Sequence, residues 1–428
     1  MSNRIDHDHN DDGVDRRGFL KCMAWTGTGL LWMMQGGVPA SRLIRPGEDL
    51  AAAAAGADFA FVQISDSHVG FDKAANPHVV ATLQEAVHRI GALPRQPAFV
   101  IHTGDISHLS APDEFDTVEQ IVRSARSTTG RVFYVPGEHD VLGDGGVSYL
   151  KRFAPRGSRN GWYSFDYNGV HFIGLVNVLD LKPGGLGNLG REQLEWLERD
   201  VKSLASSTPI VVFAHVPLWS AYPDWGWGTD DGALALSYLK RFGSVTVLNG
   251  HIHQVMQKVE GNVTFHTALS TAFPQPAPGT ARSPGPIAVP PGTLRDYLGI
   301  ADVRYVRGAH GLAVVDASLS GAPPVTAHGV LASGAAGARR EAVRTAPNEV
   351  AIDNFSFTPG TLSVSRGTRI TWVNRDDVPH QVVSVDKRFA PSPVIDTGQR
   401  FSLALTKPGR YGYFCAIHPR MVGTVVVT

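Results

Sequence analysis

The residues best suited to chemistry in this chain are carboxylates and histidines in five short motifs. In chain order the motifs are Asp66-Ser67-His68, Gly104-Asp105, Gly137-Glu138-His139-Asp140, His215 and Gly250-His251-Ile252-His253. Carboxylate oxygen and imidazole nitrogen suit Mn, Fe, Zn or Co better than a soft metal. One Asp-x-His pair arises easily by chance, but five ordered motifs indicate a metal site.

A second set of ligand-type residues lies near the end of the chain. Cys415, His418 and Met421 follow the spacing C-x-x-H-x-x-M, which puts all three on one short loop, and His380 lies upstream. A thiolate, two imidazoles and a weak thioether form the ligand set of blue-copper electron-transfer sites. The alternative is a buried thiol beside a core methionine, which leaves this spacing unexplained. We therefore expect a copper site.

The elements that must position the five carboxylate and histidine motifs are predicted to form an α/β domain. Short apolar runs alternate with amphipathic stretches at 79–90 and 191–204, as is typical of this class. The runs cover residues 59–64, 99–101, 132–135, 210–213 and 245–248. Each motif directly follows a run, and strand ends at one edge of an α/β sheet converge on a ligand crevice. The motif side chains should therefore meet in one pocket.

Three further segments complete the expected outline of this domain. Asn168-Gly169 between two apolar runs predicts a β-hairpin over 162–176. The Pro-dense residues 273–292 predict an irregular loop. A last strand pair is expected within 306–317.

The residues around the second set read as a separate all-β domain over 347–428. Turn residues such as Pro359-Gly360 separate short strand-like runs, which is typical of a β-sandwich. The runs cover residues 350–352, 362–364, 369–373, 381–385, 401–405, 411–414 and 424–427. Composition predicts linkers at 330–346 and at 41–57, so the α/β domain should span 58–329.

The five ordered motifs resemble those of the metallophosphoesterases, the calcineurin-like phosphoesterase superfamily. This resemblance implies a four-layer α/β sandwich in which mixed β-sheets are flanked by helices. It also implies a dinuclear centre that hydrolyses phosphate esters, with metals such as Fe, Mn or Zn. The first metal would take Asp66, His68 and His253, the second would take Glu138, His215 and His251, and Asp105 would bridge both. His139 would contact the substrate phosphate and protonate the leaving oxygen, and Asp140 would orient His139.

Glu138 departs from the family pattern, which usually has Asn at this position. A carboxylate in place of a neutral amide makes the dinuclear core one charge unit less positive, which weakens its attraction for phosphate and its effect on bound water. One hypothesis is that a trivalent iron restores this charge. Two alternatives remain open: Glu138 ligates as Asn would, or it marks lost or altered catalysis.

The second set closely resembles the cupredoxins, especially the short-loop type found in amicyanin, over about residues 348–428. This resemblance implies an all-β Greek-key sandwich that binds one copper ion. By family position the copper ligands are His380, Cys415, His418 and the axial Met421, with Asn374 bracing the ligand loops.

The N-terminus resembles a bacterial twin-arginine signal peptide over residues 1–40. Arg16-Arg17 precede Phe-Leu-Lys and a mild apolar run, and Val38-Pro39-Ala40 offers small residues for cleavage. We therefore expect export to the periplasm and no stable membrane span after cleavage; the apolar run is shorter than the ~18 residues that a membrane helix needs. An uncleaved anchor is the alternative. Cleavage would remove Cys22 and leave Cys415 as the one cysteine.

Composition limits the remaining classes of protein. The 428 residues exceed one ordinary domain, and a charged fraction of 18% argues against disorder. Lys+Arg and Asp+Glu balance at 39 each, so no nucleic-acid surface is expected. The two cysteines exclude a disulfide-stapled scaffold.

Several residues near the motifs carry less specific signals. His102, His108, His171 and His266 are interpreted as structural histidines. The aromatic segment 219–227 could wall a substrate pocket, or it could be a packed surface loop.

The leading interpretation is an exported phosphoesterase for small phosphate mono- or diesters with an appended copper domain, which could serve a periplasmic redox partner. The alternative is a copper or electron-transfer protein in which the phosphoesterase fold is a non-hydrolytic or redox metal scaffold. A weaker third interpretation is a binding module with neither activity.

Overall fold

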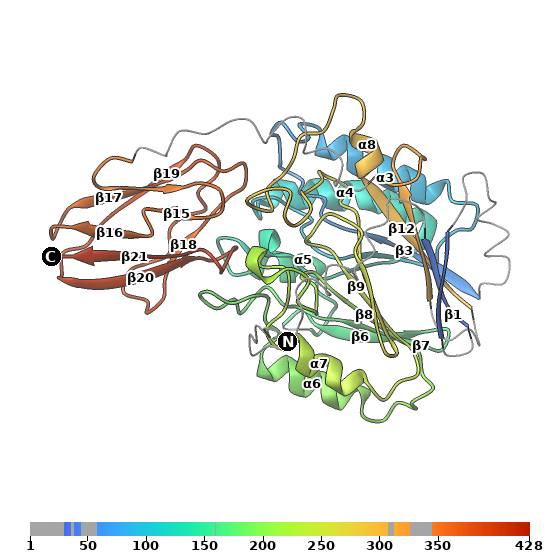
Figure 1. Cartoon of the computed structure of the whole chain (residues 1–428). Coiled ribbons are helices and arrows are strands. Elements are labelled where there is room, and N and C mark those ends of the chain that lie inside the picture. Colours follow the sequence, from blue (N-terminus) through green and yellow to red (C-terminus); the bar gives the residue numbers. More distant parts are fainter. Residues whose placement is uncertain (1–29, 36–37, 44–57, 159, 307–311, 326–344) are drawn as a thin grey trace, which may run out of the picture.

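The computed structural model describes residues 30–35, 38–43, 58–158, 160–306, 312–325 and 345–428. These residues form a large α/β domain and a smaller all-β domain, which lies against one end of the larger domain (Figure 1). In the described part of the chain, none of the helices has both the length and the apolar character needed to cross a membrane. The signal-peptide prediction lies mostly outside the described residues.

One half of the α/β domain is a five-stranded sheet of order β13-β12-β3-β4-β5. Its strands are β3 (Phe59–Ile64), β4 (Val100–His102), β5 (Val132–Tyr134), β12 (Gly299–Tyr305) and β13 (Leu312–Ser318). Strands β3, β4 and β5 are mutually parallel, so their carboxyl ends share one edge. The helices over this sheet are α3 (Val79–Gly91), α4 (Pro112–Thr129), α5 (Val147–Phe153) and α8 (Leu294–Tyr297). Apolar residues such as Val62, Leu83 and Phe115 pack the helices onto the sheet.

The other half is a six-stranded sheet of order β10-β11-β9-β8-β7-β6. Its strands are β6 (Tyr163–Tyr167), β7 (Val170–Gly174), β8 (Ile210–Ala214), β9 (Val245–Asn249), β10 (Gln257–Glu260) and β11 (Val263–Thr267). Helices α6 (Arg191–Val201) and α7 (Gly232–Leu239) cover its outer face, where Leu194, Leu197 and Leu239 join its core. The segment between β8 and α7 carries the short 3-10 helix η2 (Pro223–Trp225).

The two sheets pack face to face through an aromatic layer. Phe61 and Phe99 from one half meet Phe172 from the other, with ring centroids 5.4 and 5.3 Å from that of Phe172. The order helix, sheet, sheet, helix gives the four layers that the resemblance implied, and the fold-class prediction is confirmed.

Two local predictions were inexact. The last strand pair is β12 and β13, and β12 lies wholly before residue 306, where the pair was expected to begin. β12 was missed because only the short helix α8 separates it from the Pro-dense segment, and because it carries the polar Asp302 and Arg304 among apolar residues. Near the N-terminus, β1 (Leu30–Gln35) pairs with β2 (Val38–Leu43), so the first residues of the expected 41–57 linker form a strand.

The all-β domain is a sandwich of two four-stranded sheets, of order β15-β14-β17-β19 and β16-β21-β20-β18. Its core contains Trp372 and Tyr413, whose rings meet edge to face at 5.4 Å. The strands are β14 (Glu349–Ile352), β15 (Phe357–Thr358), β16 (Thr361–Val364), β17 (Arg369–Asn374), β18 (Val382–Ser384), β19 (Arg400–Ala404), β20 (Gly409–Cys415) and β21 (Val422–Val427). The all-β prediction is confirmed; only the two-residue β15 was not anticipated.

Candidate functional site

The five motifs lie at the carboxyl ends of five strands that come from both sheets. Asp66 and His68 follow β3, Asp105 follows β4, and Glu138 begins the 3-10 helix η1 (Glu138–Val141) after β5. From the facing sheet, His215 follows β8, and His251 and His253 follow β9. Parallel strands present their carboxyl ends on one side, and the sheet-on-sheet packing brings the two sets of ends together. The structure therefore gathers all seven expected ligands in one place.

The seven side chains fall into two groups joined by Asp105. Asp66, His68 and His253 present ligand atoms within 4.8 Å of one another, and so do Glu138, His215 and His251. Asp105 Oδ2 lies 3.5 Å from His68 Nε2 in the first group and 3.3 Å from His215 Nε2 in the second. We call this set of seven residues the candidate dinuclear site.

The backbone of the candidate dinuclear site is strained. Five of its residues lie at left-handed φ angles between 40° and 72°: Asp66, His68, Asp105, His251 and His253. Non-glycine residues rarely adopt this conformation, and such strain clusters at functional sites. The motif glycines are needed for close approach, because a Cβ on Gly137 would lie 2.0 Å from Asp105 Oδ1 and one on Gly250 would lie 2.1 Å from Ser65 Oγ.

Buried charge in this site calls for a cation. Burial and the nearby Glu138 carboxylate raise the pKa of Asp105 well above its usual value, so an ionised Asp105 is poorly compensated by the protein alone. Glu138 Oε2, His215 Nε2 and His251 Nδ1 are buried without a hydrogen-bond partner, although Glu138 Oε2 and His215 Nε2 are only 3.0 Å apart. Buried polar atoms are normally paired, so these converging lone pairs fit metal ions.

The structure corrects the role expected for Asp140. Its carboxylate accepts hydrogen bonds from the backbone of Ile106, Ser107 and Gly137 and from the Ser107 hydroxyl, and none from His139. With its acceptor capacity used by the loops after β4 and β5, Asp140 holds those loops together rather than orienting His139.

His139 is instead oriented by the backbone. Its Nδ1 donates to the carbonyl of His108 at 2.9 Å, which leaves Nε2 as the free ring nitrogen. Burial lowers the pKa of His139 to about 4, so the ring is neutral near neutral pH. The ring lines the same pocket as Asp105 and Glu138.

The remaining histidines have structural partners. His102 Nε2 lies 2.8 Å from Ser67 Oγ, and His266 Nε2 lies 3.0 Å from Asp316. His171 contacts Asp166 and Asp200 at 2.8 and 2.9 Å. These contacts support the structural interpretation of His102, His171 and His266. The carbonyl of His108 accepts from His139, and the His108 ring joins His68 and His139 in a further group of ligand atoms within 4.8 Å of one another.

The aromatic segment after β8 serves both of the roles considered for it. Trp219 and Trp227 are buried in the core beneath the six-stranded sheet's helices. Trp225 packs edge to face on Trp227 at 5.1 Å and lines the pocket. Trp225 and Trp227 therefore both line the pocket, and the buried Trp219 and Trp227 anchor the loop.

In the all-β domain, three expected copper ligands converge. Nδ1 of His380 and Nδ1 of His418 lie 3.3 Å apart, and the sulfur of Cys415 lies 3.6 and 3.7 Å from them. The loop is closed by hydrogen bonds from Cys415 N to the Met421 carbonyl and from Met421 N to the His418 carbonyl. Burial would raise the pKa of Cys415, but His380 and His418 outweigh it and lower the pKa well below its usual value. A thiolate between two imidazole nitrogens fits a copper ion. We call His380, Cys415, His418 and Met421 the candidate copper site.

Two residues support the candidate copper site from behind. Asp376 lies 3.0 Å from Nε2 of His380, which fixes the ring so that Nδ1 faces the sulfur. Asn374 donates to the carbonyls of Val378 and Ile395, which confirms its bracing role. Asp376 was missed at the sequence level, although a carboxylate four residues before a ligand histidine is the available signal.

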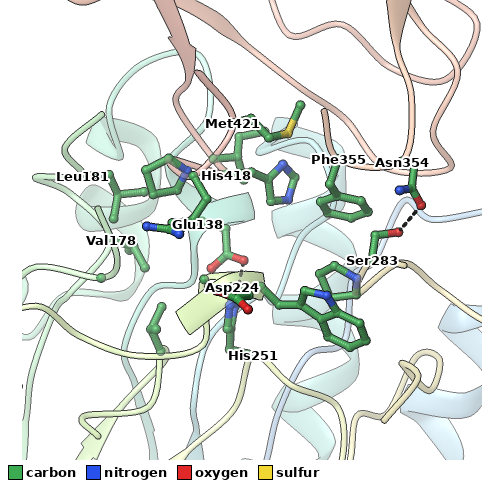
Figure 2. A pocket seen from close by; sticks show the side chains of 18 of the residues that line it. Glu138, Val178, Leu181, Asp224, His251, Ser283, Asn354, Phe355, His418 and Met421 are labelled. Atoms are coloured by element: carbon green, nitrogen blue, oxygen red, sulfur yellow. Dashed lines mark hydrogen bonds and ion pairs between the residues drawn. The ribbon is translucent and has the colours of Figure 1, made fainter. Parts of the chain in front are cut away.

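The two candidate sites adjoin. The rings of His139 and His418 have centroids 6.4 Å apart, and both residues line the same pocket. Figure 2 shows His418 and Met421 from the all-β domain above Glu138 and His251 of the candidate dinuclear site. Sequence analysis missed this arrangement, because no local pattern reports how two domains dock.

Comparisons with known proteins agree with this division. Residues 59–255 match the calcineurin-like phosphoesterase family and residues 325–427 match the cupredoxin-like domain. Amicyanin-alpha of Methylorubrum extorquens is 35% identical over 118 residues, which cover 26% of this chain and 98% of that protein. Among solved structures, a purple cupredoxin from Nitrosopumilus maritimus is 32% identical, and the match covers 19% of this chain and 98% of that protein, with a TM-score of 0.18.

Two relatives match the larger domain. A 3',5'-cyclic-nucleotide phosphodiesterase of Nostoc is 25% identical over 224 residues, which cover 49% of this chain and 77% of that protein. A glycerophosphodiester phosphodiesterase of Enterobacter lignolyticus is 26% identical over 201 residues, which cover 45% of this chain and 69% of that protein. The chain therefore belongs to the cupredoxin family through its C-terminal domain, which is joined to a calcineurin-like phosphoesterase domain.

Proposed function

We propose that this protein is an exported, metal-dependent phosphoesterase that hydrolyses phosphate diesters or monoesters at the candidate dinuclear site. The observation that carries the proposal is the convergence of seven ligand side chains in two groups that share Asp105. The phosphodiesterase names of the two relatives of the larger domain support this reaction class. The Arg16-Arg17 motif supports export by the twin-arginine pathway to the periplasm.

The chain's own residues divide the work around the metals. Bound metal ions would supply an activated water and neutralise phosphoryl charge. Asp66, His68 and His253 would hold one ion and Glu138, His215 and His251 the other. His139 presents Nε2 to the pocket, with Nδ1 held by the His108 carbonyl. Beside a bound phosphate the ring would take up a proton, because a nearby anion favours the charged form, and its Nε2–H would then donate to the phosphoryl or leaving oxygen. Asp140 keeps the loops that carry Asp105 and His139 in register.

The position of Glu138 supports its role as a ligand, since its two oxygens lie 2.9 and 3.0 Å from His251 Nδ1 and His215 Nε2. Its charge lowers that of the core by one unit, and we propose that an iron(III) in one position restores it. Elemental analysis with electron paramagnetic resonance of active protein tests this. Active protein that holds only divalent ions would refute the iron hypothesis and leave the hydrolase proposal intact.

Hydrolysis of 4-nitrophenyl phosphate and bis(4-nitrophenyl) phosphate by metal-loaded protein tests the main proposal. Asp105→Asn removes the charge of the ligand that the two groups share. It should lower kcat/KM by more than about 100-fold, because even residues that only support metal ligands are worth about 10–100-fold. The sign of failure would be metal-replete protein that hydrolyses neither ester.

The adjoining histidines favour a second candidate function. His139, which lines the pocket at the candidate dinuclear site, and His418 of the candidate copper site have ring centroids 6.4 Å apart. This is a short path for an electron between metals in the two sites. In this function the phosphoesterase fold is a redox metal scaffold, and a periplasmic redox partner exchanges electrons with the copper domain. Metal-replete protein that lacks hydrolysis, but whose copper spectrum changes when the candidate dinuclear site is loaded, would select this candidate.

A further inference from the structure

A cavity of about 110 Å³ lies between the two domains, directly over the candidate dinuclear site. Glu138 and His251 form part of its wall on the phosphoesterase side. The opposite wall comes from the cupredoxin domain, with Phe355 and the copper loop residues 417–421 (Figure 2). The space over the phosphoesterase ligands is thus enclosed by both domains.

Hydrogen bonds hold the cupredoxin wall in place at two points. The Gly184 backbone donates to the Pro419 carbonyl at 2.6 Å, and Nη1 of Arg420 donates back to the Gly184 carbonyl at 2.9 Å. At a second point, the Ser283 hydroxyl donates to Oδ1 of Asn354 at 2.9 Å. These contacts seat the copper loop and the 354–355 turn on the larger domain, so the wall has a defined position.

Phe355 is presented to the cavity by a strained turn. Asn354 and Phe355 lie at φ 55° and 53°, a conformation that is a genuine outlier for a bulky residue. Asp376 holds this turn by accepting hydrogen bonds from both backbone N–H groups. The Phe355 ring then packs edge to face on His418 at 4.7 Å. Strain retained at one aromatic residue points to a use for that ring.

The cavity combines flat apolar surface with positive charge. Trp225 from the larger domain and Phe355 from the smaller one offer rings, and Val178, Leu181 and Ile417 add aliphatic surface. Arg282 and Arg420 also line the cavity, and both are exposed. The positive charges of Arg282 and Arg420 lie in the same cavity as the negatively charged Glu138. The Glu138 carboxylate makes the metal core less positive than the amide of an asparagine would.

We propose that the cupredoxin wall is part of the substrate-binding site, and that it selects phosphoesters whose organic group carries a flat, largely apolar ring. The ring lies between Trp225 and Phe355, and Arg420 attracts the anionic ester. Small polar alcohols such as glycerol leave these surfaces unfilled and bind less tightly. This inference names the substrate class of the proposed phosphoesterase site, and it rests on that function for catalysis but not for binding.

Binding of phosphonates, which cannot be hydrolysed, tests the inference independently of activity. We expect calorimetry of the metal- and copper-loaded protein to show phenylphosphonate binding about 10-fold more tightly than methylphosphonate, on the scale of one aromatic contact. Phe355→Ala should abolish this preference while leaving methylphosphonate binding within about 2-fold. Arg420→Ala should weaken the binding of both phosphonates by a similar factor, because it removes a positive charge that attracts the phosphonate group common to both.

The controls separate a lost wall from a damaged fold. Arg410→Ala, an exposed residue at the far end of β20 from Cys415, should leave both affinities unchanged. The visible copper absorption reports whether each variant keeps its copper loop. If Phe355→Ala loses that absorption, Trp225→Leu on the opposite wall replaces it and should remove the same preference.

Each outcome has a distinct meaning. Equal affinity for the two phosphonates, or a preference that survives both aromatic substitutions, overturns the inference even if the enzyme hydrolyses esters. A ring preference that the substitutions remove, in a protein with no hydrolysis, supports the binding site and refutes the proposed function instead. Absence of binding by either phosphonate to metal-loaded protein also overturns the inference.

Discussion

The candidate dinuclear site and the candidate copper site are built in opposite ways. The first collects its ligands from the ends of five strands in two sheets, between Asp66 and His253. The second takes Cys415, His418 and Met421 from a single loop closed by two backbone hydrogen bonds. Five residues of the first site have left-handed backbone, whereas none of the four copper-site residues has. The first site therefore depends on strand-end geometry across a whole domain, whereas the second depends on one short loop.

The largest loss of activity should come from adding one methyl group, the Cβ of an alanine, that disturbs only the candidate dinuclear site. Gly137→Ala places a Cβ 2.0 Å from Asp105 Oδ1 and 2.5 Å from the Asp105 backbone nitrogen. Because Asp105 joins the two ligand groups, we expect loss of bound metal and a fall in kcat/KM of more than about 100-fold. The copper absorption should persist.

The matched control for this substitution is Gly91→Ala, where a Cβ meets nothing within 4 Å. It should retain metal and activity. Full activity in Gly137→Ala would show that the strand-end geometry is more forgiving than this comparison holds.

The converse substitution is Cys415→Ser, which removes the thiolate from the copper loop. Copper absorption should disappear, because no other cysteine lies among the described residues. The side chain is nearly isosteric and the loop hydrogen bonds use backbone atoms, so hydrolysis should stay within about 3-fold, as for uncoupled sites. A parallel collapse of hydrolysis would mean that the two sites act as one and would favour the redox candidate.

A smaller effect, on copper affinity, is expected from Asp376, which contacts the ligand His380. Asp376→Asn removes the charge that lies 3.0 Å from His380 Nε2. Outer-shell partners of this kind are worth about 10–100-fold in metal affinity. Competition with a copper chelator should show weakened copper binding within this range, and metal content of the candidate dinuclear site should not change. Unchanged copper affinity would contradict the bracing role of Asp376.

The smallest effect concerns stability of the larger domain alone. Burial lowers the pKa of His171, but Asp200 and Asp166 outweigh it and the net pKa is raised. A raised folded-state pKa stabilises the fold fully below the unfolded value of about 6.5 and loses that contribution as pH rises through the folded value. His171→Gln should therefore reduce the thermal stability of the larger domain at pH 6, and the deficit should shrink toward pH 9.

The measurement for this prediction is scanning calorimetry of both proteins at several pH values. The temperature at which the copper absorption is lost, followed separately by visible spectroscopy, should be the same in both proteins. A deficit that grows with pH would show that the contacts of His171 with its two aspartates do not stabilise the charged ring.

Much of each site could be predicted because its signal is local. Asp66 and Asp105 were placed at strand ends because short apolar runs precede them, and the copper loop was predicted from its own spacing. The role of Asp140 was not predictable, since its partners include Ile106 and Ser107 of another loop. Motif order says which residues share a site but not which of them hydrogen-bond.

Apart from the expected metal ligands and the aromatic segment 219–227, which contains Trp225, the lining of the interdomain cavity had no sequence signal. Phe355 and Arg420 read as ordinary residues between strands, and Arg282 lies in the Pro-dense segment. Their positions depend on how the two domains dock, through contacts such as Gly184 with Pro419. Such non-local contacts leave no periodicity or spacing for a single sequence to display.

The copper loop both holds the copper ligands and contacts the larger domain, and this double role limits which changes of its sequence or length are tolerated. Between Cys415 and Met421 the same few residues must close around a metal on one side and carry Pro419 and Arg420 to Gly184 on the other. An inserted residue that the copper ion tolerated would still displace the docking contacts, and a change that improved docking would move His418. Replacement of this loop by a longer one from another cupredoxin should therefore fail in the joined protein even where it succeeds in an isolated copper domain.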